Sequence, residues 1–262
     1  MELGLGGKVA LVAAASRGLG KACALALARE GAAVAMCSRD DAAISAAAAD
    51  IRQQTGATVL PLVADVSQVG ACERVVAATA ERLGRLDVLV NNAGGPPTGQ
   101  GVEMTDEQWE AAFHTNLMSC VRLSRAAVPH MRQAGGGRII NITSSGVRMP
   151  LPRLVLSNAI RAAIINFAKT LSFELGEDGI LVNNVAPGRI WTERIDQLDA
   201  ADAANAGISQ EEMRQRKYRD IPLGRYGRPD ELGDVVAFLA SGRASYLSGQ
   251  TILVDGAMVR AN

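Results

Sequence analysis

Short apolar runs alternate along the chain with longer stretches in which apolar residues recur at helical spacing. Each short run, rich in β-branched residues, predicts a strand, and each longer stretch predicts an amphipathic helix. The predicted strands cover residues 8–13, 33–38, 57–66, 86–94, 137–145, 180–188 and 251–255. The predicted helices cover 18–31, 40–54, 106–134, 155–175 and 229–241, with another between the third and fourth strands and a polar helical segment reaching about residue 220.

The predicted strands are mostly continuous apolar runs, which is typical of strands covered by helices on both faces. The repeated strand–helix order therefore predicts an α/β fold, a Rossmann-like doubly wound parallel sheet of about seven strands. No linker composition and no repeat period divides the 262 residues. We expect residues 1–262 to form one domain.

The charge balance excludes several classes of function. Lys plus Arg and Asp plus Glu both number 27, so the chain lacks the basic surplus of a nucleic-acid-binding surface. Aromatic residues make up only 3% of the chain, which also argues against a base-stacking platform. No apolar run approaches the roughly 20 residues of a spanning helix, and the first residues lack a targeting pattern. We expect a cytoplasmic protein without a membrane or nucleic-acid partner.

The cysteines and histidines do not indicate a metal centre. The four cysteines are scattered without a Cys-x-x-Cys pair, which predicts buried free thiols. They are Cys23, Cys37, Cys72 and Cys120. Only two histidines occur, far apart in the chain, so we expect no metal site.

A glycine turn follows the first predicted strand and opens the first predicted helix. Gly18 and Gly20 in "AAASRGLGKA" would let backbone amides approach a pyrophosphate at the positive end of the helix. Two glycines at a strand-to-helix junction are equally compatible with a tight turn that binds nothing. The turn therefore needs support from other positions.

The end of the second predicted strand bears on the choice of dinucleotide. A carboxylate at this point would hold an adenosine ribose, but Ser38 stands there and Arg39 follows. With Arg17 in the glycine turn, Arg39 supplies positive charge suited to a ribose 2′-phosphate. Two ordinary solvated arginines are the alternative, and we favour NADP(H).

Two further strand ends carry polar residues suited to a nucleotide. Asp65 in "ADVS" can accept a hydrogen bond from an adenine amine. Asn92, Ala93 and Gly94 in "NNAG" let the backbone pass close to a cofactor, although Asn91 and Asn92 are also common turn formers. Neither motif decides the matter alone.

Taken together, these motifs and their order resemble the short-chain dehydrogenase/reductase family along essentially the whole chain. The resemblance also rests on "HTNLMS", "RIINITSS", "VNNVAPGRIWTE" and "GQTILVDGA". It implies an NADP(H)-dependent oxidoreductase, acting on a carbonyl, hydroxyl or conjugated enone or enoyl substrate, that forms a homo-oligomer, with a tetramer favoured. The cofactor-binding positions that it implies are Ser16, Arg17, Gly18, Leu19, Gly20, Ser38, Arg39, Asp65, Val66, Asn92, Ala93, Gly94, Arg161, Pro187, Gly188, Ile190 and Thr192.

The resemblance also points to two substitutions in the catalytic set. The family uses a Ser, a Tyr and a Lys, helped by an Asn, and Ser144 and Asn116 match the Ser and the Asn. Where the Tyr and the Lys are expected, the chain has Ser157 and Arg161, and no Tyr precedes Tyr218. The family's proton donor is therefore expected to be absent.

A third departure lies in the glycine turn. The family pattern begins with Thr-Gly, whereas this chain has Ala13 and Ala14. An alanine at position 14 adds a methyl group and does not readily adopt a positive φ. We expect this change to weaken or reshape cofactor binding.

The substituted pair leaves three functions open. A Ser hydroxyl is a poor general acid at neutral pH, and an Arg, with an ordinary pKa above about 12, does not readily pass on a proton. First, the protein still transfers hydride through NADP(H), with Ser144, Ser157 and Arg161 holding an oxyanion and the proton coming from water or substrate. Second, the scaffold carries non-redox chemistry, as in halohydrin dehalogenases, which have Arg for Lys but retain the Tyr and have lost the nucleotide turn. Third, the chain binds NADP without catalysis, as a sensor or partner subunit.

Two structural alternatives also remain. Ser157 and Arg161 are compatible with a pair of surface-tolerated helix residues that have no function. Residues 192–226 resemble the family's mobile substrate lid, although a plain pair of surface helices fits the same polar composition.

Overall fold

Every strand in the computed structural model, which describes residues 2–260, belongs to one parallel sheet. The order is β3-β2-β1-β4-β5-β6-β7, so the connections reverse direction between β1 and β4. This reversal is the switch point beside which ligands bind in doubly wound sheets. The strands are β1 (Val9–Val12), β2 (Ala33–Ser38), β3 (Val59–Val63), β4 (Val88–Asn91), β5 (Gly137–Ile142), β6 (Ile180–Pro187) and β7 (Thr251–Val254).

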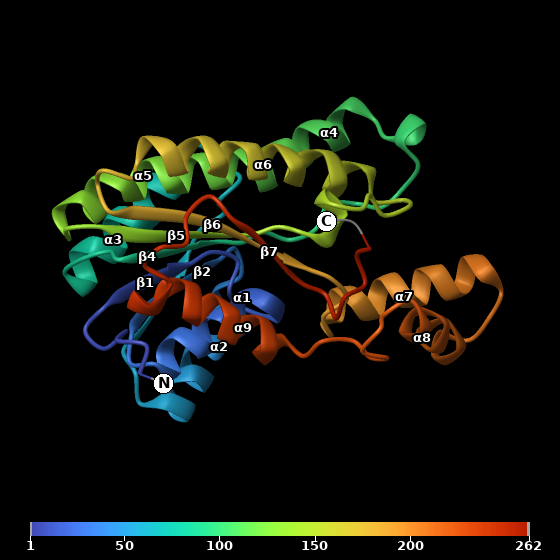
Figure 1. The fold of residues 1–262 in the computed structure, drawn as a ribbon, viewed down its shortest axis with the longest axis horizontal. Helices are drawn as coiled ribbons and strands as arrows, with labels where there is room; N and C mark the ends of the chain where they lie inside the picture. Colours follow the sequence, from blue (N-terminus) through green and yellow to red (C-terminus); the bar gives the residue numbers. More distant parts are fainter. Residues whose placement is uncertain (1, 261–262) are drawn as a thin grey trace.

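Helices cover both faces of the sheet (Figure 1). On one face lie α1 (Gly18–Arg29), α2 (Asp41–Thr55) and α9 (Pro229–Ala240), and on the other lie α3 (Ala71–Leu83), α5 (Ser119–Gln133) and α6 (Val155–Glu174). Alternate residues of β1 consequently enter different cores: Ala10 and Val12 pack in one apolar cluster and Leu11 in the other. The predicted doubly wound fold is confirmed, because seven parallel strands form one sheet with helices packed on both of its faces.

A row of polar side chains crosses this apolar sheet from the last residue of β4 to the first residue of β7. Asn91 of β4 donates to Asn141 Oδ1 of β5 (2.8 Å), and Asn141 donates to Asn184 Oδ1 of β6 (2.9 Å). Asn184 in turn reaches Thr251 Oγ1 of β7 (3.2 Å). These residues are also direct partners in the strand register. The row therefore joins four neighbouring strands at one level of the sheet.

The single long helix predicted for residues 106–134 is wrong in one respect. Two α-helices, α4 (Asp106–Ala112) and α5, are separated by a turn of π-helix, Phe113–Met118. Asn116 lies in this turn, where its Nδ2 donates to the carbonyl of Ala112 (3.2 Å). A wider turn of this kind is common at functional sites, because it re-aims a side chain inside a helix.

Several predicted strands are longer than the observed ones. The strand predicted for 57–66 ends at Val63, and the one predicted for 86–94 ends at Asn91. The apolar residues beyond these ends belong to loops at the carboxyl edge. Their pattern continues because these loops also pack against the core.

The polar segment after β6 forms two helices that project from the body (Figure 1). They are α7 (Glu193–Ala206) and α8 (Gln210–Arg219), separated by Gly207 with φ 66°. Asp199 is fully buried at their base and accepts hydrogen bonds from Lys217 Nζ (2.7 Å) and Tyr226 Oη (2.9 Å). This buried charge cluster ties α7, α8 and the following segment together, and removing one partner would leave a buried charge unpaired.

The four cysteines are buried free thiols, as predicted, and burial raises the pKa of Cys72 to about 11. No helix within residues 2–260 combines the length and apolar content needed to cross a bilayer.

Candidate active site

The glycine turn is held against the end of β4 by one side chain. Asn92 Nδ2 donates to the carbonyls of Ala13 and Ala14, both at 3.2 Å. Gly20 lies against the same point, where an added Cβ would be 2.5 Å from the Ala14 oxygen and 2.7 Å from Asn92 Nδ2. Only glycine fits at position 20, so its role in this structure is to let the first turn of α1 approach β1 and β4.

The first turn of α1 is open to an anion. Arg17 is the N-terminal capping residue, yet no side chain caps the helix and no acidic residue lies in its first turn. The backbone N–H groups here and the helix dipole together favour a negatively charged ligand. The predicted residues Ser16, Arg17, Gly18, Leu19 and Gly20 lie at this helix start, and their binding of a phosphate stays a prediction.

Ala14 adopts the left-handed conformation that its side chain was expected to disfavour. Its φ is 47°, one of three positive values among non-glycine residues in the described chain. The turn keeps the shape that a glycine would adopt, so the substitution adds backbone strain without refolding the turn.

The positions predicted to bind the adenosine ribose and the adenine amine lie at the ends of β2 and β3, respectively. Ser38 Oγ donates to the carbonyl of Asp40 (3.0 Å), and Asp65 Oδ1 accepts from Ser67 Oγ (2.7 Å). Arg39 is exposed and takes part in none of the ion pairs found in residues 2–260. Arg17 is paired with Glu193 of α7, with 2.9 Å between NH1 and Oε2.

The segment after β6 passes the glycine turn. Thr192 caps α7 by accepting from the Ile195 N–H (3.3 Å), and its methyl carbon is 3.6 Å from where a Cβ on Gly18 would lie. Gly188 is packed so closely on Asp255 that an added Cβ would be 2.6 Å from the Asp255 Cβ. Thr192 and α7 are therefore anchored next to the proposed pyrophosphate turn.

Two predicted cofactor residues, Val66 and Ile190, turn their side chains into the core, where they are 8% and 3% exposed. Only their backbone groups are available to a ligand. Pro187 is the last residue of β6 and is also buried.

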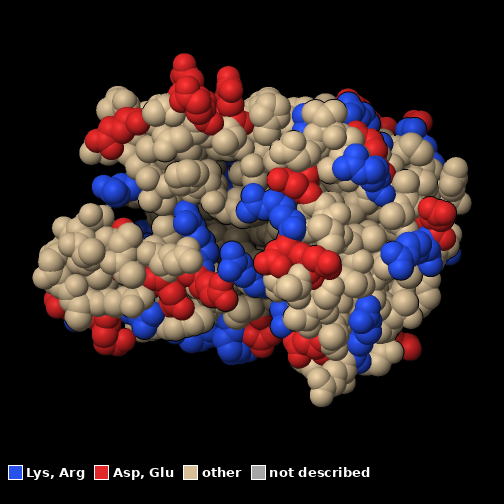
Figure 2. All heavy atoms as spheres, turned by 180° about the vertical axis from the view of Figure 1, so that it is seen from behind, with Lys and Arg blue, Asp and Glu red and all other residues tan. Residues whose placement is uncertain are grey.

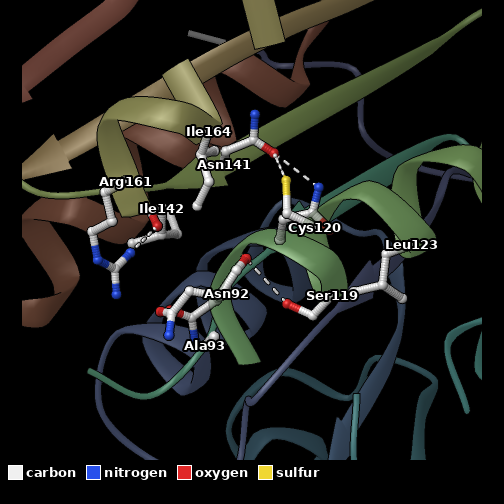
Figure 3. A pocket seen from close by; sticks show the side chains of 11 residues that line it. Asn92, Ala93, Ser119, Cys120, Leu123, Asn141, Ile142, Arg161 and Ile164 are labelled. Carbon is white, nitrogen blue, oxygen red and sulfur yellow. Dashed lines mark hydrogen bonds between the residues drawn. The ribbon is translucent and has the colours of Figure 1, made fainter. Parts of the chain in front are cut away.

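A small polar cavity lies between the ends of β4 and β5 and the helices α5 and α6 (Figure 3). Its volume is about 10 Å³, close to the space that one water molecule needs. It is lined by Asn91, Asn92, Ala93, Asn116, Ser119, Cys120, Leu123, Asn141, Ile142, Arg161 and Ile164. Asn91 Oδ1 and Asn116 Oδ1 are buried there without a hydrogen-bond donor. The structure thus brings the predicted Asn116 and Arg161 to one cavity beside Asn92 and Ala93.

Arg161 is buried, and no carboxylate within residues 2–260 forms an ion pair with it. Its side chain projects from α6, is 7% exposed, and donates from NH1 to the carbonyl of Ile142 at 2.7 Å (Figure 3). Burial lowers the pKa of the guanidinium to about 10, below the range expected from the sequence, but it remains charged at neutral pH. The interpretation of Arg161 as a surface-tolerated residue is wrong, because a buried uncompensated cation is costly unless a ligand offsets it.

Ser144 lies near the start of the loop between β5 and α6, and Ser157 lies just after the loop, on α6. Ser144 Oγ accepts from the Gly146 N–H (3.1 Å), which leaves its own hydroxyl proton available to another acceptor. Ser157 is half-buried in the first turn of α6, one turn before Arg161. Two hydroxyls and a guanidinium can hold an oxyanion, but none of them is an effective acid at neutral pH.

Several residues of this region were not identified from the sequence. Asn91 was interpreted as a turn former, yet with Asn141 and Asn184 it forms the polar row across the sheet. The sequence does indicate this row, because the predicted strands 86–94, 137–145 and 180–188 each contain an Asn three or four residues before their end. Glu193, the partner of Arg17, carried no such signal.

The strain at Ala14 predicts an unusual effect of a glycine substitution. Ala14→Gly is expected to raise the free energy of unfolding by about 0.5–1 kcal/mol, because glycine adopts φ 47° without a side-chain clash. Ala15→Gly is the matched control: Ala15 is buried and lacks a positive φ, so glycine there is expected to destabilise the fold. Urea unfolding of both variants measures the difference, and destabilisation by both would contradict the strain.

A family model described as "Enoyl-(Acyl carrier protein) reductase" matches residues 13–258. The chain is 37% identical over 254 residues to a 3-oxoacyl-[acyl-carrier-protein] reductase of Synechocystis, covering 96% of this chain and 97% of that protein. It is 36% identical over 248 residues to the short-chain reductase protein NovJ of Streptomyces niveus, covering 95% and 92%.

Among solved structures, an L-sorbose reductase of Gluconobacter frateurii complexed with NADPH and L-sorbose superposes with a TM-score of 0.95. It is 33% identical in sequence, and the match covers all of both chains. These similarities span the glycine turn, the polar cavity and the projecting helices alike. The chain belongs to the short-chain dehydrogenase/reductase family.

Proposed function

We propose that this protein is an NADPH-dependent reductase of a carbonyl or conjugated enone substrate, in which Ser157 and Arg161 occupy the places of the family's Tyr and Lys. The observation that carries the proposal is the buried Arg161 guanidinium. It lies in one cavity with Asn92 and Ala93, next to the glycine turn, and pairs with no carboxylate in the described part of the chain. A ligand that passes along the ends of β1 and β4 would meet it.

The preference for NADPH over NADH rests on Arg17 and Arg39. Both are exposed near the end of β2 or the start of α1, and Ser38 stands where an NAD-binding site would place a carboxylate. A ribose 2′-phosphate is well matched by two guanidinium groups. The L-sorbose reductase that superposes on this chain was solved with NADPH.

The reduced cofactor, when bound, supplies hydride. The residues of this chain then stabilise the negative charge that develops on the substrate oxygen. Ser144 donates its free hydroxyl proton, and Arg161 donates from the nitrogen atoms that do not bind Ile142. Ser157 lies one turn before Arg161 on α6. Without the family's Tyr, the proton is expected to come from water, and the cavity beside Asn116 has the volume and the free acceptors to hold one.

A second candidate is a protein that binds NADP(H) without turning it over. It is favoured by one observation, that none of Asn116, Ser144, Ser157 and Arg161 titrates between pH 5 and 8 in the manner of a general acid. The two candidates share the cofactor site and differ only in whether hydride leaves it.

We also propose that residues 192–226, which include the projecting α7 and α8, act as a substrate lid. Figure 2 shows a hollow between this pair and the body, with Lys or Arg side chains on its walls. Assembly into a homotetramer and a cytoplasmic location stay predictions from the family resemblance. Further experiments concern the cofactor and the catalytic residues.

The function is tested by cofactor titration followed by turnover. NADPH is expected to bind more tightly than NADH. Arg39→Ala is expected to weaken NADPH binding at least tenfold, or about 1.4 kcal/mol, because it removes the guanidinium that meets the 2′-phosphate. The same substitution is expected to change NADH binding less than twofold. Arg82→Ala, an exposed arginine of α3, is the control. Isothermal titration measures the constants, and equal affinities for the two cofactors would exclude the NADP site.

Removal of the substituted pair tests the catalytic proposal. NADPH oxidation is followed with 2-cyclohexen-1-one, a crotonoyl thioester and an acetoacetyl thioester as probes. With the most active probe, Arg161→Met is expected to lower kcat/KM about 10²–10³-fold, and Ser157→Ala to lower it with little change in NADPH affinity. Rapid reduction of simple ketones by the unmodified protein would contradict the absence of a proton donor in this account. Cofactor binding without turnover of any probe favours the second candidate.

The pH dependence gives an independent test. Because burial lowers the pKa of Arg161 to about 10 and no other member of the set titrates lower, kcat/KM should stay flat from about pH 6 to 9 and fall near pH 10. Arg161→Lys should move this fall to lower pH, since a lysine ammonium starts near 10.4 and burial lowers its pKa further. A fall at the same pH in both proteins would mean that another group titrates.

A further inference from the structure

Asn158 is the residue after Ser157, and its carboxamide ties α6 to the loop that follows Ser144. Asn158 Nδ2 donates to the carbonyl of Leu151 (2.9 Å), and the Leu151 N–H reaches Asn158 Oδ1 by a longer contact (3.4 Å). The side chain thus binds both backbone groups of one loop residue. Such a two-point contact fixes the loop in the way that a strand pairing would.

The same carboxamide lies over Gly146. A Cβ at position 146 would overlap Asn158 Oδ1, so a side chain there is excluded by the amide itself. Gly146 is also the residue whose N–H donates to Ser144 Oγ (3.1 Å). Asn158 therefore contacts Gly146, and the Gly146 N–H donates the hydrogen bond that orients the Ser144 hydroxyl.

The loop has little other regular structure to hold it. Between β5 and α6 it contains only a turn of 3-10 helix, Ser145–Val147. Arg153, near its end, has φ 61°, and the Arg153 carbonyl accepts from the Gly99 N–H (2.8 Å). A strained loop persists only when its surroundings fix it, and Asn158 supplies the side-chain contacts that do so on the α6 side.

We propose that Asn158 is a positioning residue, which holds Gly146 so that Ser144 accepts from the backbone and donates its own proton to the substrate oxygen. The inference rests on the role proposed above for Ser144. In this arrangement Asn158, on the neighbouring helix α6, determines the direction of the Ser144 hydrogen bond. Asn158 itself need not touch substrate or cofactor.

The test compares two asparagines of α6. Asn158→Leu removes both contacts at similar volume, and Asn158→Asp keeps Oδ1 but places a carboxylate oxygen against the Leu151 carbonyl. Asn166→Leu is the control: Asn166 is exposed two turns later, and its Nδ2 donates to the Ala162 carbonyl of its own helix (3.1 Å). Thermal unfolding and circular dichroism confirm which variants fold.

With the most active of the three probe substrates, Asn158→Leu and Asn158→Asp are each expected to lower kcat about tenfold to hundredfold with NADPH affinity unchanged. The decisive measurement is a double-mutant cycle with Ser144→Ala. If Asn158 acts through Ser144, Asn158→Leu lowers kcat less than twofold further in the Ser144→Ala background. Independent, multiplicative losses in the cycle, or equal kcat values for Asn158→Leu and Asn166→Leu, would overturn the proposal.

Hydrogen exchange separates this inference from the proposed function. If the unmodified protein turns over none of the probes, the proposed activity fails, but the loop contact remains measurable. Peptides covering residues 144–151 should exchange faster in Asn158→Leu than in the unmodified protein and in Asn166→Leu. Unchanged exchange in Asn158→Leu would overturn the positioning role whatever the activity.

Discussion

The hydrogen-bonded row of Asn91, Asn141 and Asn184 fixes the register on which the rest of the structure depends. When strands are apolar on both faces, a shifted pairing still buries apolar side chains, so the hydrophobic pattern specifies register only weakly. A carboxamide buried among such strands is different, because a slip of one residue would leave its donors and acceptors unpaired. The three amides lie at one level of neighbouring strands and are joined by two hydrogen bonds, while Asn91 Oδ1 faces the cavity without a donor from the described residues. The row also fixes the height at which the candidate site residues lie, because Asn92, Ser144 and Pro187 each follow a member of the row by one to three residues.

The elements that periodicity controls could be predicted from the sequence, and those set by contacts between distant segments could not. The strands, the flanking helices and the closely packed glycines follow from local pattern and backbone geometry. The π-helical turn at Phe113–Met118 leaves no periodic trace in so few residues. The pairing of Arg17 with Glu193 joins positions 176 residues apart, and no local signal indicates it. The sequence pattern does not indicate the contacts of Asn158, because a polar residue on a helix normally faces solvent.

The burial of Arg161 places a cation in the cavity at the ends of β4 and β5. Within residues 2–260 the guanidinium donates one hydrogen bond, to the Ile142 carbonyl, and burial lowers its pKa to about 10. Planar guanidinium groups carry several donors in fixed directions, so the remaining donors stay available to a ligand. A lysine at this point would concentrate its charge on one nitrogen and titrate more readily when buried. Arginine therefore suits a site that stabilises charge, and it is unsuited to passing a proton.

Backbone strain is concentrated at the edge of the sheet where this charge is held. Within residues 2–260, the non-glycine residues with positive φ are Ala14, Arg153 and Ala257. They follow β1, β5 and β7, so all three lie in loops at the carboxyl ends of strands. Each such residue costs on the order of 1 kcal/mol, and it persists only where neighbouring contacts determine the conformation. Asn92 supplies those contacts at Ala14, the Gly99 N–H does so at Arg153, and Asp255 accepts from the Ala257 N–H (3.0 Å). At this edge the backbone conformations differ from those that the residue types prefer. In a chain that elsewhere agrees with its local preferences, such a disagreement is expected at a functional site.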